Sequence, residues 1–242
     1  FEISVTEHLS EGFALSWWRV LLMPALGGAL IGAVGWAIRT WRKREAVDPI
    51  EANALYGGRM SLTDSLNIGL LTLISSGFGA SVGMEAAYTQ VASSLGSRFG
   101  GLLRLRREDV RTLVGCGAAA GIAAAFNAPL AGAFYAFELI IGGYTLARLA
   151  PVAIAALIGA LTTRGLLGAD PIFVIDRSVR IGTADYGAFL ALGVASAGLA
   201  ILVMKGVTGT ERLFRAQAIP VMLRPVLGGL VVGAVALAFP QV

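Results

Sequence analysis

The chain has 242 residues, of which 56% are hydrophobic and only 14% are charged, and its mean hydropathy is +0.76. Soluble domains carry about 25% charged residues, so this composition indicates a membrane protein rather than an ordinary soluble domain. The net charge of +4 comes from basic residues in short clusters between apolar runs, which is typical of topology signals and argues against nucleic acid as a partner. The single cysteine, Cys116, excludes an internal disulfide and a multi-cysteine metal site, and we expect it to be a packed small residue in a protein without metal or cofactor.

The amino-terminal stretch, residues 1–12, is polar and mildly acidic. It has no basic segment followed by a small-residue cleavage site, so it is not a signal peptide, and we expect an exposed loop or a cut end in which His8 is solvated. Trp17 and Trp18, next to an arginine, are typical of an anchor at the membrane interface. The uncharged residues 20–38 predict the first span, because a span needs about 20 apolar residues.

A basic run at residues 39–44 separates this span from a short predicted helix at 47–55. The Asp-Pro pair in that segment supplies a favoured N-cap followed by proline at the first helical position. Residues 56–59 (YGGR) predict a turn. The apolar pattern then resumes over residues 61–76 and leads to a glycine-rich approach to the first isolated carboxylate.

That carboxylate is Glu85, and no residue between Asp64 and Glu85 is charged. An ionisable residue at membrane depth is costly and by default indicates a transport pathway. Gly79 and Gly83 allow the backbone to turn just before Glu85, so we expect a helix that begins there and ends near Ser97, too short to cross a bilayer. The unpaired N–H groups and the positive dipole end of such a helix would face an anion. The segment therefore predicts an anion site within the membrane.

The second isolated carboxylate is Glu138. It follows the arginine-rich stretch 98–111 and an uncharged run at 112–137 that is long enough to span. Glycines and a proline in this run predict two pieces that meet at residues 127–129, and we expect Asn127 to cap the second piece. Interrupted half-helices of this kind are what membrane transporters use to place helix ends at the bilayer midplane.

Three more apolar segments predict further spans, with an aspartate-bearing loop at 164–185 between the first two. The segments are residues 149–161, 186–204 and 226–238. If the apolar segments run up and down through the membrane, the basic clusters all fall on one side, and the positive-inside rule makes that side cytoplasmic. These clusters are residues 39–44, 98–111 and 205–224.

Two blocks of sequence resemble those of the CLC chloride channels and chloride/proton antiporters, in matching order and spacing. The first is residues 83–90 (GMEAAYTQ). The second, which is longer and more specific, is residues 117–138 (GAAAGIAAAFNAPLAGAFYAFE). The resemblance implies an all-α polytopic membrane protein with broken half-helices, built from two inverted repeat halves. It also implies a homodimer with a pore in each subunit, and we expect a multi-pass protein of a prokaryotic inner membrane.

The resemblance further divides the chain. We expect one transmembrane domain over residues 1–242, with 15–165 in the first repeat half and 184–242 at the start of the second. In the family the second half continues with a Gly-x-Phe-x-Pro motif and a late pore tyrosine, which this sequence does not contain. We therefore expect the second half to be incomplete here.

Carried over to this sequence, the resemblance makes Glu85 the gating glutamate, whose carboxylate competes with chloride and moves aside when it is protonated. Backbone groups of Gly83, Met84, Glu85 and Ala86 would line the anion site. The family usually has arginine, glycine and proline at the positions of Met84, Ala86 and Ala87. The field at this site is therefore expected to be less positive than in those relatives.

Two further departures from the family concern the central anion site and the proton path. Residues 43–49 read KREAVDP where the family has a Gly-Ser-Gly-Ile-Pro loop, so the serine that contacts the central chloride is missing. In antiporters of the family the inner proton glutamate follows the position of Glu138 by one residue, and Leu139 stands there. We therefore expect weak or absent proton coupling, with Glu138 as the remaining candidate on a proton path.

The function predicted from these features is transport of chloride, or of a similar small anion, by a channel or weakly proton-coupled exchanger in the lipid bilayer. The alternatives are a tightly coupled chloride/proton or fluoride/proton antiporter and, in another class, a non-transporting membrane scaffold. A membrane enzyme is disfavoured because the apolar segments contain no Ser/His or Cys/His pair and no cluster of metal ligands.

Each candidate site residue also has a purely structural interpretation. Glu85 could be bonded to helix N–H groups as a structural carboxylate, and Glu138 could pair with Arg148 or with helix ends. Large aromatic side chains in such segments more often pack than line a pore. We therefore expect packing roles for Tyr88, Phe126 and Tyr135.

Overall fold

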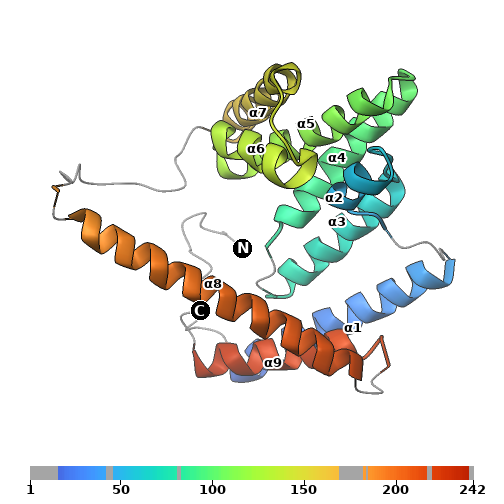
Figure 1. The fold of residues 1–242 in the computed structure, drawn as a ribbon. Coiled ribbons are helices and arrows are strands. Elements are labelled where there is room, and N and C mark those ends of the chain that lie inside the picture. Colours follow the sequence, from blue (N-terminus) through green and yellow to red (C-terminus); the bar gives the residue numbers. More distant parts are fainter. Residues whose placement is uncertain are drawn as a thin grey trace.

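The computed structural model describes residues 16–41, 46–80, 83–168, 182–183, 185–216 and 220–239. Over these residues the chain forms α-helices and one π-helical segment, η2, with no strand, in the arrangement of Figure 1. The elements are α1 (Trp17–Trp41), α2 (Pro49–Leu55), α3 (Leu62–Gly77), α4 (Glu85–Leu102), α5 (Arg107–Phe126), α6 (Pro129–Tyr135), η2 (Ala136–Ile141), α7 (Leu146–Leu167), α8 (Asp185–Ala216) and α9 (Arg224–Ala238).

Four of the described helices are long and apolar enough to cross a membrane, which confirms the prediction of a multi-span α-helical membrane protein. They are α1, α5, α7 and the stretch Asp185–Phe214 of α8. Two shorter apolar segments accompany them, Pro129–Ile141 and α9.

Several helices extend past their predicted ends. Helix α1 continues past residue 38 to Trp41, and α7 continues to Leu167, so the loop predicted from residue 164 begins later than expected. Helix α8 continues to Ala216 through residues that the sequence suggested were a polar segment after the span, because lysine, glutamate and arginine are good helix formers and end an apolar run without ending the helix. Helix α4 continues past Ser97 to Leu102. Its backbone turns away only at Arg104, which has a φ of 51°.

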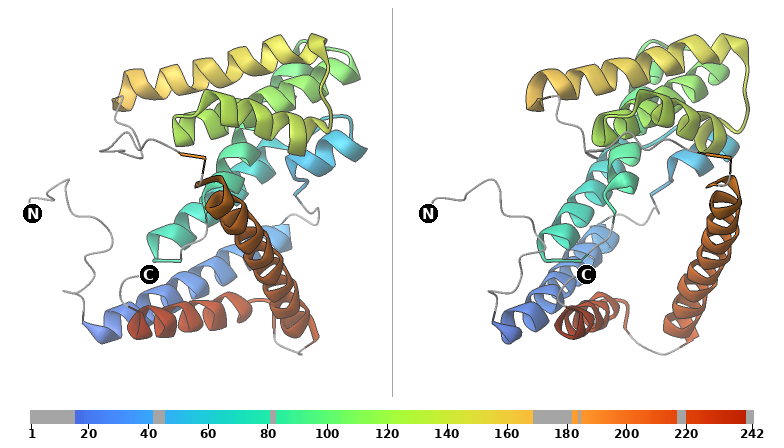
Figure 2. Two further views of the ribbon diagram at one scale, coloured as in Figure 1. Left: turned by 60° about the vertical axis from the view of Figure 1, so that its left-hand side comes forward. Right: turned by 90° about the vertical axis from the view of Figure 1, so that its left-hand side faces the viewer.

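Helices α1 and α9 lie side by side, as both views in Figure 2 show. Each helix has two glycines four residues apart at the contact: Gly28 and Gly32 in α1, and Gly229 and Gly233 in α9. A Cβ at any of these four positions would crowd backbone atoms of the facing segment. Paired small residues at this spacing let membrane helices approach closely. Helices α1 and α9 therefore pack through direct contact between their backbones.

Helix α8 differs from the others in having no buried residue between positions 185 and 213. Figure 2 shows this helix standing away from the group formed by α2 to α7. Its apolar side chains are therefore on the surface of the described structure.

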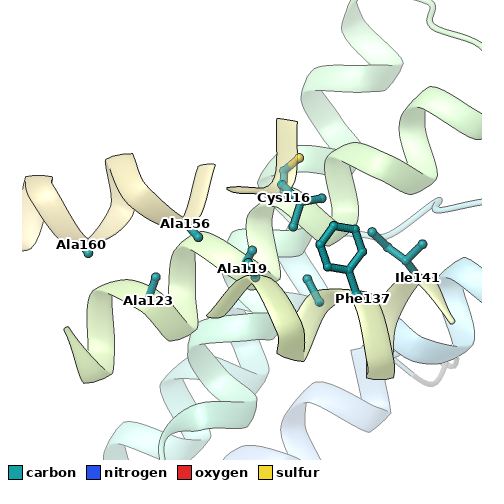
Figure 3. Packing of buried hydrophobic residues seen from close by; sticks show 10 residues of the cluster. Cys116, Ala119, Ala123, Phe137, Ile141, Ala156 and Ala160 are labelled. Atoms are coloured by element: carbon teal, nitrogen blue, oxygen red, sulfur yellow. The ribbon is translucent and has the colours of Figure 1, made fainter. Parts of the chain in front are cut away.

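The interior between α5, α6, η2 and α7 consists mostly of alanines, shown in Figure 3. Phe137 is the largest side chain that it encloses, at 2% exposure. Cys116 is buried in the same cluster, which confirms the prediction of a packed small residue. Small side chains keep these helices close together, and the segment η2, which carries Glu138, packs against α5, α6 and α2.

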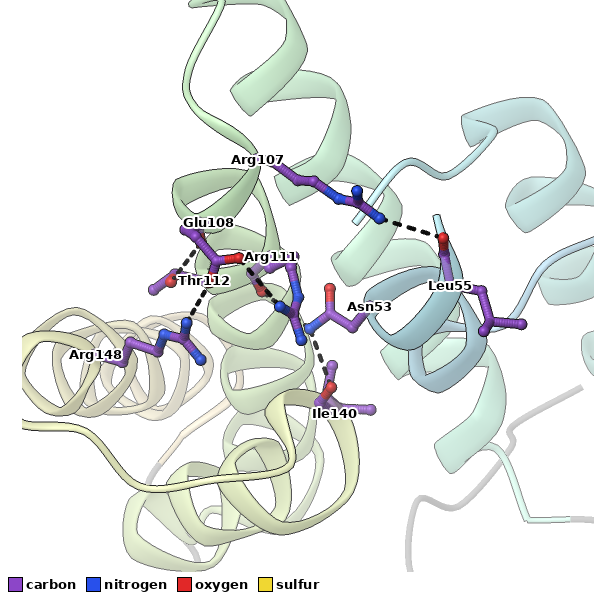
Figure 4. Close-up of polar contacts among 8 residues, drawn as sticks. All are labelled: Asn53, Leu55, Arg107, Glu108, Arg111, Thr112, Ile140 and Arg148. Atoms are coloured by element: carbon purple, nitrogen blue, oxygen red, sulfur yellow. Dashed lines mark hydrogen bonds and ion pairs between the residues drawn. The ribbon is translucent and has the colours of Figure 1, made fainter. Parts of the chain in front are cut away.

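Helix α2 begins as the sequence predicts, with the Asp48 carboxylate accepting a hydrogen bond from the Glu51 N–H at 2.7 Å and proline at the first position. It carries Asn53, a polar residue that is 1% exposed. The Asn53 amide donates to the carbonyl oxygens of Arg111 (3.1 Å) and Ile140 (3.0 Å), as Figure 4 shows. One side chain therefore ties α2 to both α5 and η2.

The predicted break in the long apolar run lies where expected, between α5 and α6. The role predicted for Asn127 is wrong, however. Asn127 terminates α5 in a left-handed conformation (φ 51°) and its side-chain oxygen accepts from the Arg164 Nε, while Ala128 is the N-cap of α6 and no side chain caps that helix. Asparagine tolerates the left-handed region better than most residues, so it suits the end of the first piece instead of the start of the second.

Candidate functional site

The candidate anion site lies at the amino terminus of α4, whose first residue is Glu85. Met84 is the N-cap, its side chain makes no capping hydrogen bond, and its carbonyl accepts the N–H of Tyr88 at 3.0 Å. The N–H groups that precede Tyr88 in this first turn have no intrahelical acceptor. Together with the helix dipole, they give this end of α4 a positive potential.

A cavity of about 350 Å³ opens at this helix end. Of the predicted site residues, Gly83, Met84 and Glu85 line it. Ala86 is next in the same turn and is exposed, but it is not part of the lining. The structure therefore brings three of the five predicted site residues together around one space that could hold a small anion.

The cavity wall also includes residues that the sequence did not predict for it. Tyr88 and Phe126 both line it and are 36% and 42% exposed, so the expectation of packing roles is wrong for these two. Ser76 and Ala80, before the Glu85 turn, complete this wall together with Ala125. The available signal was helical periodicity, since Tyr88 follows Glu85 by three positions and so shares its face of α4.

The Glu85 side chain is half-buried and folds back over Gly83. A Cβ built on Gly83 would overlap a Glu85 carboxylate oxygen, and it would lie 2.9 Å from the carboxyl carbon. Within the described part of the chain, the carboxylate has no hydrogen-bond or ion-pair partner. The structural alternative for Glu85, a carboxylate bonded to helix N–H groups, is therefore without support among the described residues.

Glu138 lies elsewhere, exposed on the π-helical segment η2. It accepts a 2.9 Å hydrogen bond from the Tyr144 hydroxyl. That bond is the main cause of a raised pKa at Tyr144, because the phenol proton is shared with a carboxylate. Leu139 is exposed beside it. Short π-helical segments are frequent at functional sites, which singles out this turn.

The expected alternative pairing of Glu138 with Arg148 is wrong. Arg148 donates to Glu108 of α5 at 2.5 Å, and Arg111 contacts the other carboxylate oxygen of Glu108 at 3.2 Å (Figure 4). Glu108, at the start of α5, therefore pairs with both guanidinium groups, and Glu138 is hydrogen-bonded to Tyr144 instead.

Two other expectations concern metals and the serine loop. Among the described residues, no group of three or more histidine, cysteine, aspartate or glutamate side chains could hold a metal ion. The segment that replaces the serine loop falls partly on residues 42–45, and the loop at 164–185 falls largely on 169–181. These stretches lie outside the described residues, as does His8.

Helices of spanning length, a break between two half-helices and a helix start beside a cavity define a multi-span membrane protein with interrupted helices, an architecture that membrane transporters use. The profile of the family described as voltage gated chloride channel matches residues 27–242. The chain therefore belongs to the voltage-gated chloride channel (CLC) family.

Individual relatives agree with this assignment. The chain is 35% identical to a ClcB-like chloride channel protein of Ralstonia nicotianae over 235 residues, which cover 95% of this chain and 54% of the relative. It is 32% identical to the voltage-gated ClC-type chloride channel ClcB of Citrobacter koseri over 232 residues, which cover 94% of this chain and 55% of that relative. The solved structure of a slow cyanobacterial Cl⁻/H⁺ antiporter shares the fold, with a TM-score of 0.75, 23% identity, and coverage of 92% of this chain and 53% of that one. The chain spans about half the length of the relatives it matches.

Proposed function

We propose that the whole protein carries chloride, or a similar small anion, across a membrane as a CLC-type channel or weakly proton-coupled exchanger. It is a transporter and not an enzyme. The observation that carries this proposal is the position of Glu85, the first residue of α4, half-buried at a cavity beside helix N–H groups in a chain of this family. A carboxylate held there is a tethered anion, and it occupies the place that those N–H groups would offer to chloride.

Gating follows from this competition. While Glu85 is ionised, its carboxylate blocks the place of the anion; once protonated, it loses its attraction to the positive helix end and can leave. The backbone of Gly83, Met84, Glu85 and Ala86 then binds the permeating ion. The absence of a hydrogen-bond partner for Glu85 among the described residues supports a side chain that is free to swing.

The second candidate function is a tightly coupled chloride/proton or fluoride/proton antiporter. It differs from the proposed channel or weakly coupled exchanger in how strictly proton movement is coupled to anion movement. Leu139 cannot hold a proton, which favours weak coupling. The Glu138–Tyr144 hydrogen bond on a π-helical turn is the observation that favours the antiporter, because it places two titratable groups side by side, as a proton relay requires.

We further propose a homodimer in a prokaryotic inner membrane, with the arginine-rich ends of α4 and α5 on the cytoplasmic side. The bacterial origin of the ClcB relatives supports the location, and the positive-inside rule supports the orientation. The family resemblance supports the dimer, and the mass of the solubilised full-length protein tests it.

The experiment is chloride efflux from liposomes that contain the purified full-length protein. Transport predicts efflux well above that of protein-free vesicles and of vesicles holding the heat-denatured protein. Efflux equal to both controls would exclude transport and would leave the third candidate, a non-transporting membrane scaffold.

A further inference from the structure

A second and larger cavity, of about 680 Å³, lies at the opposite end of α4 from Glu85. It is bounded by the turn after α2, the carboxyl-terminal end of α4 and the first turns of α5. Helix α4 has 18 residues, so the two ends lie roughly 27 Å apart at 1.5 Å per residue. The larger cavity is therefore separate from the candidate anion site.

Three arginines from three different segments line this cavity: Arg59, Arg104 and Arg107. The Arg107 guanidinium donates to the carbonyl of Leu55 at the end of α2 (3.3 Å), which holds it at the cavity wall, as Figure 4 shows. Arg59 and Arg104 have no ion-pair or hydrogen-bond partner for their side chains among the described residues. The site thus gathers positive charge that no described carboxylate neutralises.

The nearest carboxylates do not remove this excess. Glu108 is engaged by Arg111 and Arg148 on the far side of α5, and neither it nor Asp109 belongs to the cavity lining. The cavity also offers polar groups that suit a phosphate, the side chains of Tyr56 and Ser97. Arginine guanidinium groups match the geometry of phosphate oxygens, so the chemistry of the lining selects a phosphate-bearing anion.

The backbone conformation at Arg104 is unusual for an arginine. Arg104 has a φ of 51° just after α4, and the Leu105 N–H closes the helix end by donating to the Gly100 carbonyl at 3.0 Å. Glycine is the usual residue at such a position, because other residues are strained there. Arg104 thus projects from a position that favours glycine.

Exposed leucines surround the three arginines. Leu55 and Leu105 belong to the lining, and Leu102 and Leu103 lie next to it at the end of α4. Leu102 is 78% exposed. Cationic side chains beside exposed hydrocarbon at a membrane boundary fit a molecule that has both a phosphate and acyl chains. A soluble phosphate compound would leave these leucines uncovered.

We propose that the cavity lined by Arg59, Arg104 and Arg107 binds the phosphate headgroup of an anionic phospholipid, with the lipid chains against the neighbouring leucines. The proposed orientation puts this end of α4 at the cytoplasmic leaflet, where basic residues meet anionic lipid. Binding here does not depend on chloride transport.

The test uses the purified, delipidated full-length protein in neutral detergent, titrated with phosphatidylglycerol and read by native mass spectrometry. Arg104→Gln is expected to weaken phosphatidylglycerol binding about tenfold, the loss typical of one charge-assisted contact. Arg98→Gln is the matched control: it removes the same charge from an exposed position of α4 outside the lining and is expected to bind as the wild type does.

The variant Arg104→Gly distinguishes a loss of lipid binding from a loss of folding stability, because glycine suits the left-handed backbone at this position. This variant is expected to melt at a higher temperature than the wild type without lipid and yet to bind phosphatidylglycerol about tenfold more weakly. Equal losses in Arg98→Gln and Arg104→Gln, or no loss in either Arg104 variant, would overturn the proposal. Displacement of the lipid by glycerol phosphate at comparable concentration would also overturn it, in favour of a soluble phosphate compound.

Discussion

The substitution Gly83→Ala tests how the Glu85 carboxylate is held. The φ of Gly83 is not positive, so its backbone accepts alanine. The new Cβ would overlap a carboxylate oxygen of Glu85 and would lie 2.9 Å from the carboxyl carbon. That carbon therefore has to move by at least about 0.5 Å to reach ordinary contact distance, and the oxygen has to move further. Since the Glu85 side chain is flexible, it rather than the backbone will move.

The expected size of the effect follows from what the carboxylate loses. A carboxylate at a helix amino terminus is stabilised by about 0.3–1 kcal/mol, and displacement removes part or all of this. At about 1.4 kcal/mol for each factor of ten, occupancy of the blocking position falls by about two- to fivefold at most. Chloride efflux at neutral pH should rise by the same factor. At acidic pH the difference should vanish, because the protonated side chain has already left.

The assay is chloride efflux from liposomes that hold equal amounts of full-length wild-type or variant protein. The matched control is Gly77→Ala, which adds the same methyl group at the end of α3, where nothing lies within 4 Å. That control should transport as the wild type does. Unchanged efflux in Gly83→Ala across the pH range would refute the idea that Glu85 blocks the site from its position over Gly83.

Three further predictions concern packing, a buried hydrogen bond and coupling. Gly28→Ala should lower the free energy of unfolding by about 1–2 kcal/mol in a detergent unfolding titration, because its methyl group meets the backbone of α9. The control Gly35→Ala, whose methyl group meets open space, should raise the free energy of unfolding by up to about 1 kcal/mol. Equal effects of the two substitutions would contradict the close packing of α1 on α9. Asn53→Ala should lower the free energy of unfolding by about 1–3 kcal/mol in the same titration, since it removes the two hydrogen bonds that the amide donates to the carbonyls of Arg111 and Ile140, and a loss below about 0.5 kcal/mol would show that water replaces the amide. The reversal potential of the wild type should stay at the chloride equilibrium potential in a pH gradient, and Leu139→Glu should shift it with pH; a clear shift in the wild type would show tight coupling.

Local signals in the sequence predicted most helix starts and breaks. The Asp48 cap, the turn after α2 and the interruption near residue 128 all depend on residues within four positions of one another, and such contacts can be read from the chain. Helix ends were less predictable: Arg104 takes the left-handed position just after α4, where glycine is usual, and charged helix formers carry α8 on to Ala216. In both cases a composition change was mistaken for the end of the helix.

The site was predictable only in part, because its wall is assembled from separate segments. Glu85 stands out as a charge in an uncharged run, and Gly83 and Met84 adjoin it. Phe126 belongs to another helix, and its place on the same cavity depends on how α5 packs against α4. The cavity lined by Arg59, Arg104 and Arg107 was missed for the same reason. In the sequence its arginines resemble ordinary topology signals, and only the packing of three segments gathers them.

The most direct test of the central claim is the pH dependence of chloride efflux in the Glu85→Gln variant of the full-length protein. Glutamine carries no charge at any pH, so it mimics the protonated, unblocked carboxyl. Wild-type efflux should rise as the pH falls, while the variant should transport faster at neutral pH and vary little with pH. A variant that retains the wild-type pH profile would show that Glu85 is not the gate.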